Sequence, residues 1–169
     1  MIVIKYIMLL FLFSLASILG ITLSKKYTYR LQELCDMQNA LNILKNKIKF
    51  TYEPLNEIFE YISNNSTKNI SNIFNSAKEK MQDISASKAW EESVEESNNN
   101  LKDEDKAVIK MLSKLLGTTD IDGQISQIEI TENFLKNQIK DAEIQKQKNE
   151  KLYKKLGFTI GAVIVIMLI

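Results

Sequence analysis

The chain has 169 residues, with 22 basic and 21 acidic side chains, and nearly all of these charges lie in its middle. Lys5 is the only charged residue before Lys25, and none follows Lys155. The middle is therefore close to neutral, which argues against nucleic acid as a partner. The chain has no histidine and one cysteine, and its five glycines form no phosphate-binding motif. These counts exclude His-based catalysis, an internal disulfide and a Cys-based zinc cluster, and we expect no metal or cofactor.

The N-terminal run, residues 6–23, is uncharged and rich in Leu, Ile and Phe. As a helix it covers about 27 Å, which is long enough to span a bilayer. The alternative is a cleaved signal peptide, with Lys5 as its basic region and a small-residue cleavage site at 14–16. Because the apolar run continues beyond Ala16, we favour a retained anchor. Residues 1–24 are therefore predicted to form an N-terminal transmembrane helix.

The C-terminal run, residues 156–169, is also uncharged and is rich in Ile and Val. It covers only about 21 Å as a helix, so its length alone also fits a buried core helix. Its composition is apolar on every side, however, and Lys154 and Lys155 can snorkel to the interface and extend the span. We therefore predict a short C-terminal transmembrane helix over 156–169.

Small residues recur at a spacing of four in both runs, Ala16 and Gly20 in the first and Gly157 and Gly161 in the second. Such rows allow helix backbones to approach closely, so the two spans are predicted to pack on each other or on partner helices.

The orientation of the chain follows from its basic residues. They cluster on the inner side of both runs, whereas the outer side has only Lys5. The positive-inside rule then places residues 25–155 in the cytosol and both termini on the far face of the cell membrane. A reduced Cys35 agrees with a cytosolic location.

Residues 25–155 are predicted to form an all-α domain, a bundle of about six helices whose first and last members extend from the spans. This segment has one proline and two glycines, and its apolar residues recur every three or four positions. Pro54 predicts the start of the second helix, and Gly117, with positive φ, the end of the fifth. The fifth helix, from about residue 102, is predicted to bury Ala107, Val108, Met111, Leu112 and Leu115. The corner at 50–55 is predicted to be a packed turn.

Four carboxylates gather on the predicted fourth helix, residues 87–97: Glu91, Glu92, Glu95 and Glu96. As a partner-binding site they would receive basic residues and steer association. The alternative is an ordinary solvated helix face, which charge runs usually are. The neighbouring Trp90 is either a core residue or a partly exposed interface anchor. Nothing in the sequence supplies a nucleophile beside the carboxylates, so no enzymatic activity is predicted.

The order of several short motifs resembles a known family. The chain carries IKFTYEPLNE at 48–57, SKAWEE at 87–92 and LLGTTD at 115–120, between an N-terminal span and a basic neck that leads to the terminal span. This arrangement is similar, from end to end, to that of the stage III sporulation protein AB family. The cytosolic part is in turn similar to the platform-protein domain of type II secretion and type IV pilus systems.

The resemblance implies a role and partners. It implies a component of the sporulation channel between mother cell and forespore, in the mother-cell-derived membrane around the forespore. The partners it implies are a cytosolic secretion-type ATPase, docked by the helical domain, and other membrane components of the same complex. The residues alone leave a second interpretation open, a generic coiled-coil membrane scaffold or signalling protein that dimerises through its long helices.

Overall fold

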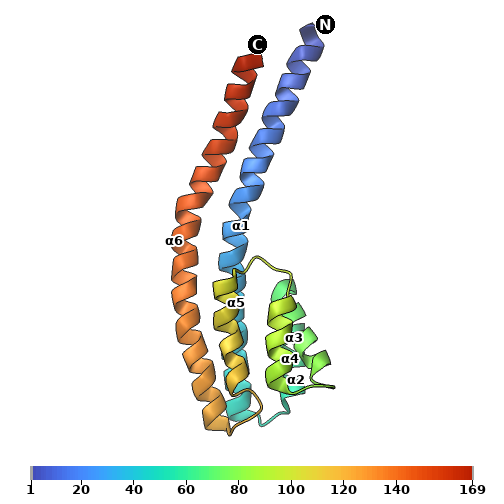
Figure 1. The fold of residues 1–169 in the computed structure, drawn as a ribbon, viewed down its shortest axis with the longest axis vertical. Coiled ribbons are helices and arrows are strands. Elements are labelled where there is room, and N and C mark those ends of the chain that lie inside the picture. Colours follow the sequence, from blue (N-terminus) through green and yellow to red (C-terminus); the bar gives the residue numbers. More distant parts are fainter. Residues whose placement is uncertain (1, 169) are drawn as a thin grey trace. The chain divides into compact units, whose positions relative to one another are not determined.

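The structure is a computed structural model that describes residues 2–168, and this part of the chain is entirely helical, with no strand. Its elements are, in chain order, α1 (Ile2–Phe50), α2 (Leu55–Asn64), α3 (Lys68–Lys80), α4 (Ala86–Glu96), α5 (Asp103–Lys110), the 3₁₀ helix η1 (Met111–Lys114) and α6 (Ile121–Leu168). The predicted all-α fold, with a long first and a long last helix, is confirmed (Figure 1).

The chain divides into two compact units. One, here called the helix pair, consists of the described residues of Met1–Leu31 and Asp141–Ile169, which belong to α1 and α6. The other, here called the helical domain, is Gln32–Lys140. The boundaries predicted at residues 24 and 155 rest on where the chain is expected to enter a bilayer, and they stay a prediction.

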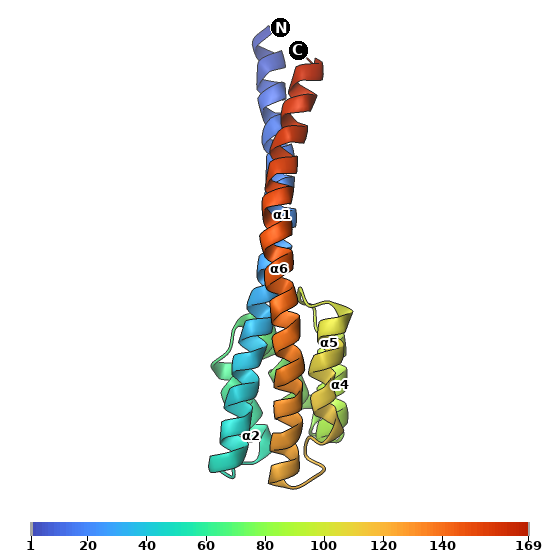
Figure 2. The same cartoon turned by 90° about the vertical axis from the view of Figure 1, so that its left-hand side faces the viewer.

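The core of the helical domain is built from one apolar stripe on each helix. On α1 the spacing of three and four is confirmed, because Leu34, Met37, Leu41, Leu44 and Ile48 are all buried. The centre of the core is aromatic. The rings of Phe59, Phe74 and Trp90 are fully buried, with centroids 5.0 to 5.7 Å apart. They come from α2, α3 and α4, which lie side by side (Figures 1 and 2).

The starts of the short helices follow local signals. Pro54 is the residue before α2, with φ −56°, which confirms the predicted helix start to within one position. α4 starts at Ala86, one residue earlier than predicted, because the Ser85 side chain accepts a hydrogen bond from the backbone N–H of Lys88 (3.4 Å) and caps the helix.

The fifth helix differs from its prediction in length and in its buried face. α5 ends at Lys110 and continues only as the short η1. The buried apolar side chains here are Ile109, Leu112 and Leu116. Of the five predicted core residues, Leu112 is buried, Ala107 is exposed, and Val108, Met111 and Leu115 are half-buried.

Two distant side chains account for this early end. Trp90 Nε1 donates a hydrogen bond to the carbonyl of Ile109 (3.0 Å), and Gln127 Nε2 donates to that of Met111 (2.7 Å). The carbonyls that lose helical partners at a helix end are thereby satisfied from outside the helix. Gly117 has φ +69°, which confirms its predicted backbone conformation. It lies beyond the ends of α5 and η1, so its predicted place at the end of the fifth helix is wrong.

In the helix pair, α1 carries the candidate membrane span. It contains an 18-residue window of mean hydropathy 2.3, and only 17% of that window is buried in the protein. The core helix of a soluble protein would be mostly buried, so this exposure favours a span. Among the described residues no other helix meets the same criterion. The predicted C-terminal span is shorter and stays a prediction.

Candidate functional site

The predicted acidic cluster lies on the outer face of α4. Glu91, Glu95 and Glu96 are exposed and Glu92 is half-buried. The inner face of the same helix is formed by Ala89, Trp90, Ser93 and Val94, all buried. The period of 3.6 residues separates the two faces, so these carboxylates point away from the core.

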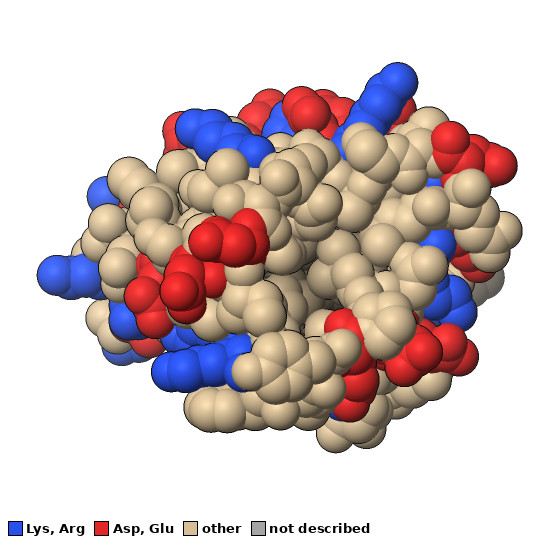
Figure 3. All heavy atoms as spheres, turned by 90° about the horizontal axis from the view of Figure 1, so that it is seen from below, with Lys and Arg blue, Asp and Glu red and all other residues tan. Residues whose placement is uncertain are grey.

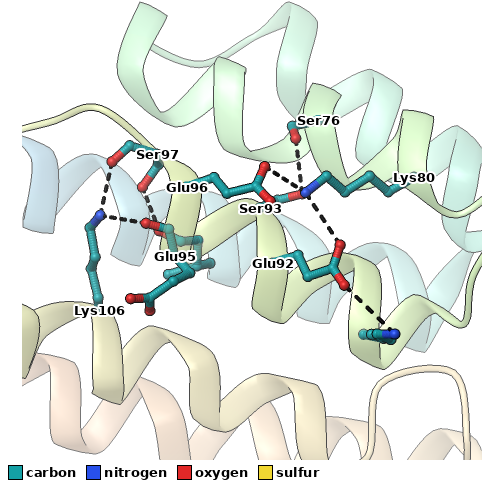
Figure 4. A network of polar contacts seen from close by, with 10 residues as sticks. Ser76, Lys80, Glu92, Ser93, Glu95, Glu96, Ser97 and Lys106 are labelled. Carbon is teal, nitrogen blue, oxygen red and sulfur yellow. Dashed lines mark hydrogen bonds and ion pairs between the residues drawn. The ribbon is translucent and has the colours of Figure 1, made fainter.

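Lysines from the neighbouring helices neutralise most of this cluster, as Figure 4 shows for Lys80. Lys80 of α3 forms ion pairs with Glu96 (2.7 Å) and with Glu92 (3.4 Å). Lys110 of α5 pairs with Glu95 at 2.7 Å. These ion pairs weaken the negative field at the surface of α4. The sequence of α4 alone does not show this, because Lys80 and Lys110 belong to other helices.

These ion pairs shift the pKa values of their members. The hydrogen bond from Lys110 lowers the pKa of the Glu95 carboxyl, and the same bond raises the pKa of the Lys110 ammonium. Hydrogen bonds to Glu96 and Glu92 raise the pKa of Lys80. All three groups lie at the surface, where ion pairs add little to stability.

Lys106 connects the end of α4 to α5. Its ammonium group donates hydrogen bonds to the backbone carbonyls of Glu95 and Ser97, both at 2.9 Å (Figure 4). A basic side chain at a helix C-terminus satisfies free carbonyls and complements the helix dipole. The acidic helix is therefore held firmly at its C-terminal end.

Trp90 lies in the core rather than at the surface. Its side chain is fully buried, and its indole N–H is bonded to the carbonyl of Ile109. The core interpretation is confirmed, and the alternative of an exposed interface anchor is wrong. Trp90 therefore supports α4 from behind and is not available to a partner.

The corner between α1 and α2 is not the packed turn that the sequence predicted. Phe50 and Tyr52, here called the aromatic corner, are 67% and 77% exposed. Tyr52 also has φ +55°, a left-handed conformation that is unfavourable for a residue with a side chain. The sequence could not reveal this, because no local signal marks a tyrosine for positive φ. Seen from the end where α1 finishes, the surface is uncharged at its centre with acidic and basic groups around it (Figure 3).

The four predicted small residues come together in the helix pair. A Cβ atom placed on Gly20 would lie 2.7 Å from the carbonyl oxygen of Tyr153 and 2.8 Å from Cα of Gly157. One placed on Gly161 would lie 2.9 Å from the ring of Phe13 and 3.4 Å from Cβ of Ala16. The two backbones thus approach to a distance that only glycine permits. Whether these residues pack within a bilayer stays a prediction.

Within the described residues, no group of three or more acidic or cysteine side chains is placed to hold a metal ion. The surfaces described above have three features: ion pairs on α4, exposed aromatic rings at the aromatic corner, and close packing of the two helices of the helix pair. These are properties of binding surfaces.

The family model of stage III sporulation protein AB matches residues 5–169 of this chain. The curated stage III sporulation protein AB of Bacillus subtilis (strain 168) is 28% identical over 153 residues, which are 88% of this chain and 90% of that protein. A solved structure of a stage III sporulation protein AB has a TM-score of 0.63 and 24% identity, and the match covers 69% of this chain and 95% of that one. That likeness shows a shared fold. With a family model that extends over nearly its whole length, the chain belongs to the stage III sporulation protein AB family.

Proposed function

We propose that this protein is a non-enzymatic membrane adaptor of the sporulation channel between mother cell and forespore, needed for endospore formation. In this proposal α1 anchors the chain, the short end of α6 forms a second span beside it, and the helical domain docks the cytosolic secretion-type ATPase of the same complex. Family membership supports the sporulation role. The ATPase and the platform role are carried over from the resemblance.

The closed core of the helical domain favours an adaptor over a coiled-coil scaffold. The apolar seam of α6 is filled from within the same chain, since Ile128 and Leu135 are fully buried. The opposing stripe of α1 is buried as well. A coiled-coil dimer would need these seams free for a second copy.

We place the ATPase-docking surface at the aromatic corner, with the acidic cluster of α4 as the second candidate. Three of the four carboxylates of α4 are already paired with lysines, Glu92, Glu95 and Glu96, whereas the rings of Phe50 and Tyr52 are exposed. Exposed aromatic residues are typical centres of binding energy. The left-handed backbone of Tyr52 costs on the order of 1–3 kcal/mol, a strain that is typical of functional positions.

The test is the affinity of the full chain, in detergent, for the ATPase. Tyr52→Gly removes the ring and relieves the strain, so it should weaken binding by about tenfold or more while leaving the domain at least as stable. The matched control is Phe134→Ala, which removes another exposed ring of the helical domain, 49% exposed on α6. It should leave the affinity unchanged.

Two results would count against these assignments. Unchanged affinity for Tyr52→Gly and Phe50→Ala would remove the aromatic corner as the docking surface. Failure of the wild-type chain to bind the ATPase at all would reject docking itself. A strain that lacks this chain and still forms endospores at the normal frequency would reject the wider role in sporulation.

A further inference from the structure

A groove of about 560 Å³ opens in the helix pair along the neck of α6. On one side it is bounded by Leu31 of α1. The other side is formed by residues of α6 whose spacing of three and four keeps them on one helix face, among them Lys146, Lys151 and Lys154. The volume is within the range of sites that hold small molecules.

The charges in this groove are incompletely balanced. Lys154 forms an ion pair with Glu150 at 2.6 Å, and the hydrogen bond in this pair lowers the pKa of the Glu150 carboxyl. Glu143, the other carboxylate of the lining, is exposed to solvent. Within the described part of the chain, neither Lys146 nor Lys151 forms a direct ion pair. Lys146 also acts on Glu150 through space, without a direct ion pair. The lining carries three lysines against two carboxylates, so the groove keeps a net positive charge.

The groove lies next to the level at which the apolar segments end. Tyr27 and Tyr153 stack on each other there, with ring centroids 5.8 Å apart. Tyrosine rings are enriched at the headgroup level of membranes. Lys151 and Lys146 precede Tyr153 by only about 3 Å and about 10 Å along the helix axis. Both ammonium groups are thus close enough to feel the charge of a membrane surface, which is screened over about 8–10 Å.

The register between the two helices fixes this height. The close approach of Gly20 and Gly157 holds the neck of α6 at one position along the candidate span of α1. In the same structure Gly161 lies against Ala16, so the small residues of the two helices are matched in this register. In this register the groove lies beside the end of the candidate span.

We propose that this groove binds the phosphate headgroup of an anionic phospholipid. Lys146 and Lys151 supply charge-assisted hydrogen bonds to the phosphate oxygens. Leu31 contacts the apolar part of the lipid that adjoins the headgroup. The proposal needs α1 to lie in a membrane and does not depend on docking of the ATPase.

The test uses the full chain in detergent, titrated with dioctanoyl phosphatidylglycerol, with bound lipid counted by native mass spectrometry. The wild type should show saturable binding of one lipid. Lys146→Gln/Lys151→Gln should weaken this binding by about tenfold or more. The matched control is Lys148→Gln/Lys155→Gln, which removes the same charge from exposed positions of the same neck outside the groove. It should change the affinity by less than about twofold if the groove, and not bulk charge, binds the lipid.

Two control titrations show whether the groove recognises a lipid headgroup or any phosphate anion. Dioctanoyl phosphatidylcholine should not bind saturably, and inorganic phosphate should displace the anionic lipid only at far higher concentration. Equal loss of binding in the two double variants would overturn the proposal in favour of non-specific attraction to the neck. Phosphate binding as tightly as the lipid, or no saturable lipid binding by the wild type, would also overturn it.

Discussion

Gly117 and Tyr52 hold the same left-handed backbone conformation, and only one of them is a glycine. Gly117 has φ +69° and Tyr52 has φ +55°. A glycine adopts this region without steric cost, whereas a side chain makes it unfavourable by about 1–3 kcal/mol. The glycine can therefore be predicted from the sequence as the end of a helical segment. The positive φ of the tyrosine cannot be predicted in this way, because no local signal marks it.

Replacing Gly117 by valine is expected to destabilise the helical domain by about 1 kcal/mol or more, because a β-branched residue is strained at φ +69°. The added Cβ would also lie 3.1 Å from Cβ of Ala86. Gly117→Asn should be milder, since asparagine tolerates positive φ. Urea unfolding of the full chain can be followed by the fluorescence of Trp90, the single tryptophan, which is buried in the core of this domain. Equal urea midpoints for the wild type and the two variants would contradict the conclusion that position 117 requires a positive φ.

The pair of Glu95 and Lys110 makes a prediction about pH. Because the folded pKa of Glu95 is lowered, its contribution to stability is complete above the ordinary pKa of a glutamate and is lost as the pH falls through the folded value. Lys110→Met should move the pKa of Glu95 upward, as seen in an NMR titration of its side-chain carboxyl carbon. The control Lys114→Met removes an exposed lysine one turn further on and should leave that titration unchanged. The same shift in both variants would mean that the pair has no specific effect.

Among the elements, those with local signals are the ones that the sequence predicts well. α2 and α4 begin within one residue of their predicted positions, because Pro54 and the capping Ser85 act locally. The prediction for α5 is wrong because its apolar residues, Ala107, Val108 and Ile109, are consecutive, so periodicity alone cannot choose the buried face. Trp90 and Gln127 decide both its face and its end, and they come from other helices.

The acidic helix shows the same limit for a candidate site. Its four carboxylates lie on the outer face of the helix, as their sequence pattern indicates. How far their negative charge is neutralised depends on Lys80 and Lys110, which lie on α3 and α5. Charge segregation along a sequence is therefore a poor measure of the field at a folded surface.

The triple variant Glu91→Gln/Glu92→Gln/Glu95→Gln tests what α4 contributes. Folding should be nearly unchanged, because the ion pairs are at the surface. If α4 contributes to docking, affinity for the ATPase should fall and become less dependent on salt, since steering by charge is screened over about 8 Å at physiological ionic strength. Measurements across a salt series, with the full chain in detergent, distinguish the cases. Affinity and salt dependence equal to those of the wild type would assign the cluster to solvation and to its internal lysine pairs.

At the scale of the whole molecule, the small residues could be predicted and the groove could not. Gly20 and Gly157 are visible in the sequence as rows of small side chains, and the structure brings them into contact. The groove needs Leu31 and Lys146 together, residues that are far apart in the chain and carry no motif. Pairwise packing of two helices can be anticipated from spacing, but a site built across them depends on their register.

The topology of the chain is the last prediction. The basic residues beside both apolar runs place the helical domain in the cytosol. Cys35 is half-buried, so a more accessible probe is preferable: Glu104→Cys, at an exposed position of α5, in a Cys35→Ser background. It should resist a membrane-impermeant maleimide in intact cells and react after permeabilisation. Ile4→Cys in the same background precedes the uncharged run 6–23 and should react before permeabilisation, because that end is predicted on the far face. The reverse pattern, with Glu104→Cys labelled in intact cells and Ile4→Cys protected, would invert the orientation and place the helical domain out of reach of a cytosolic ATPase.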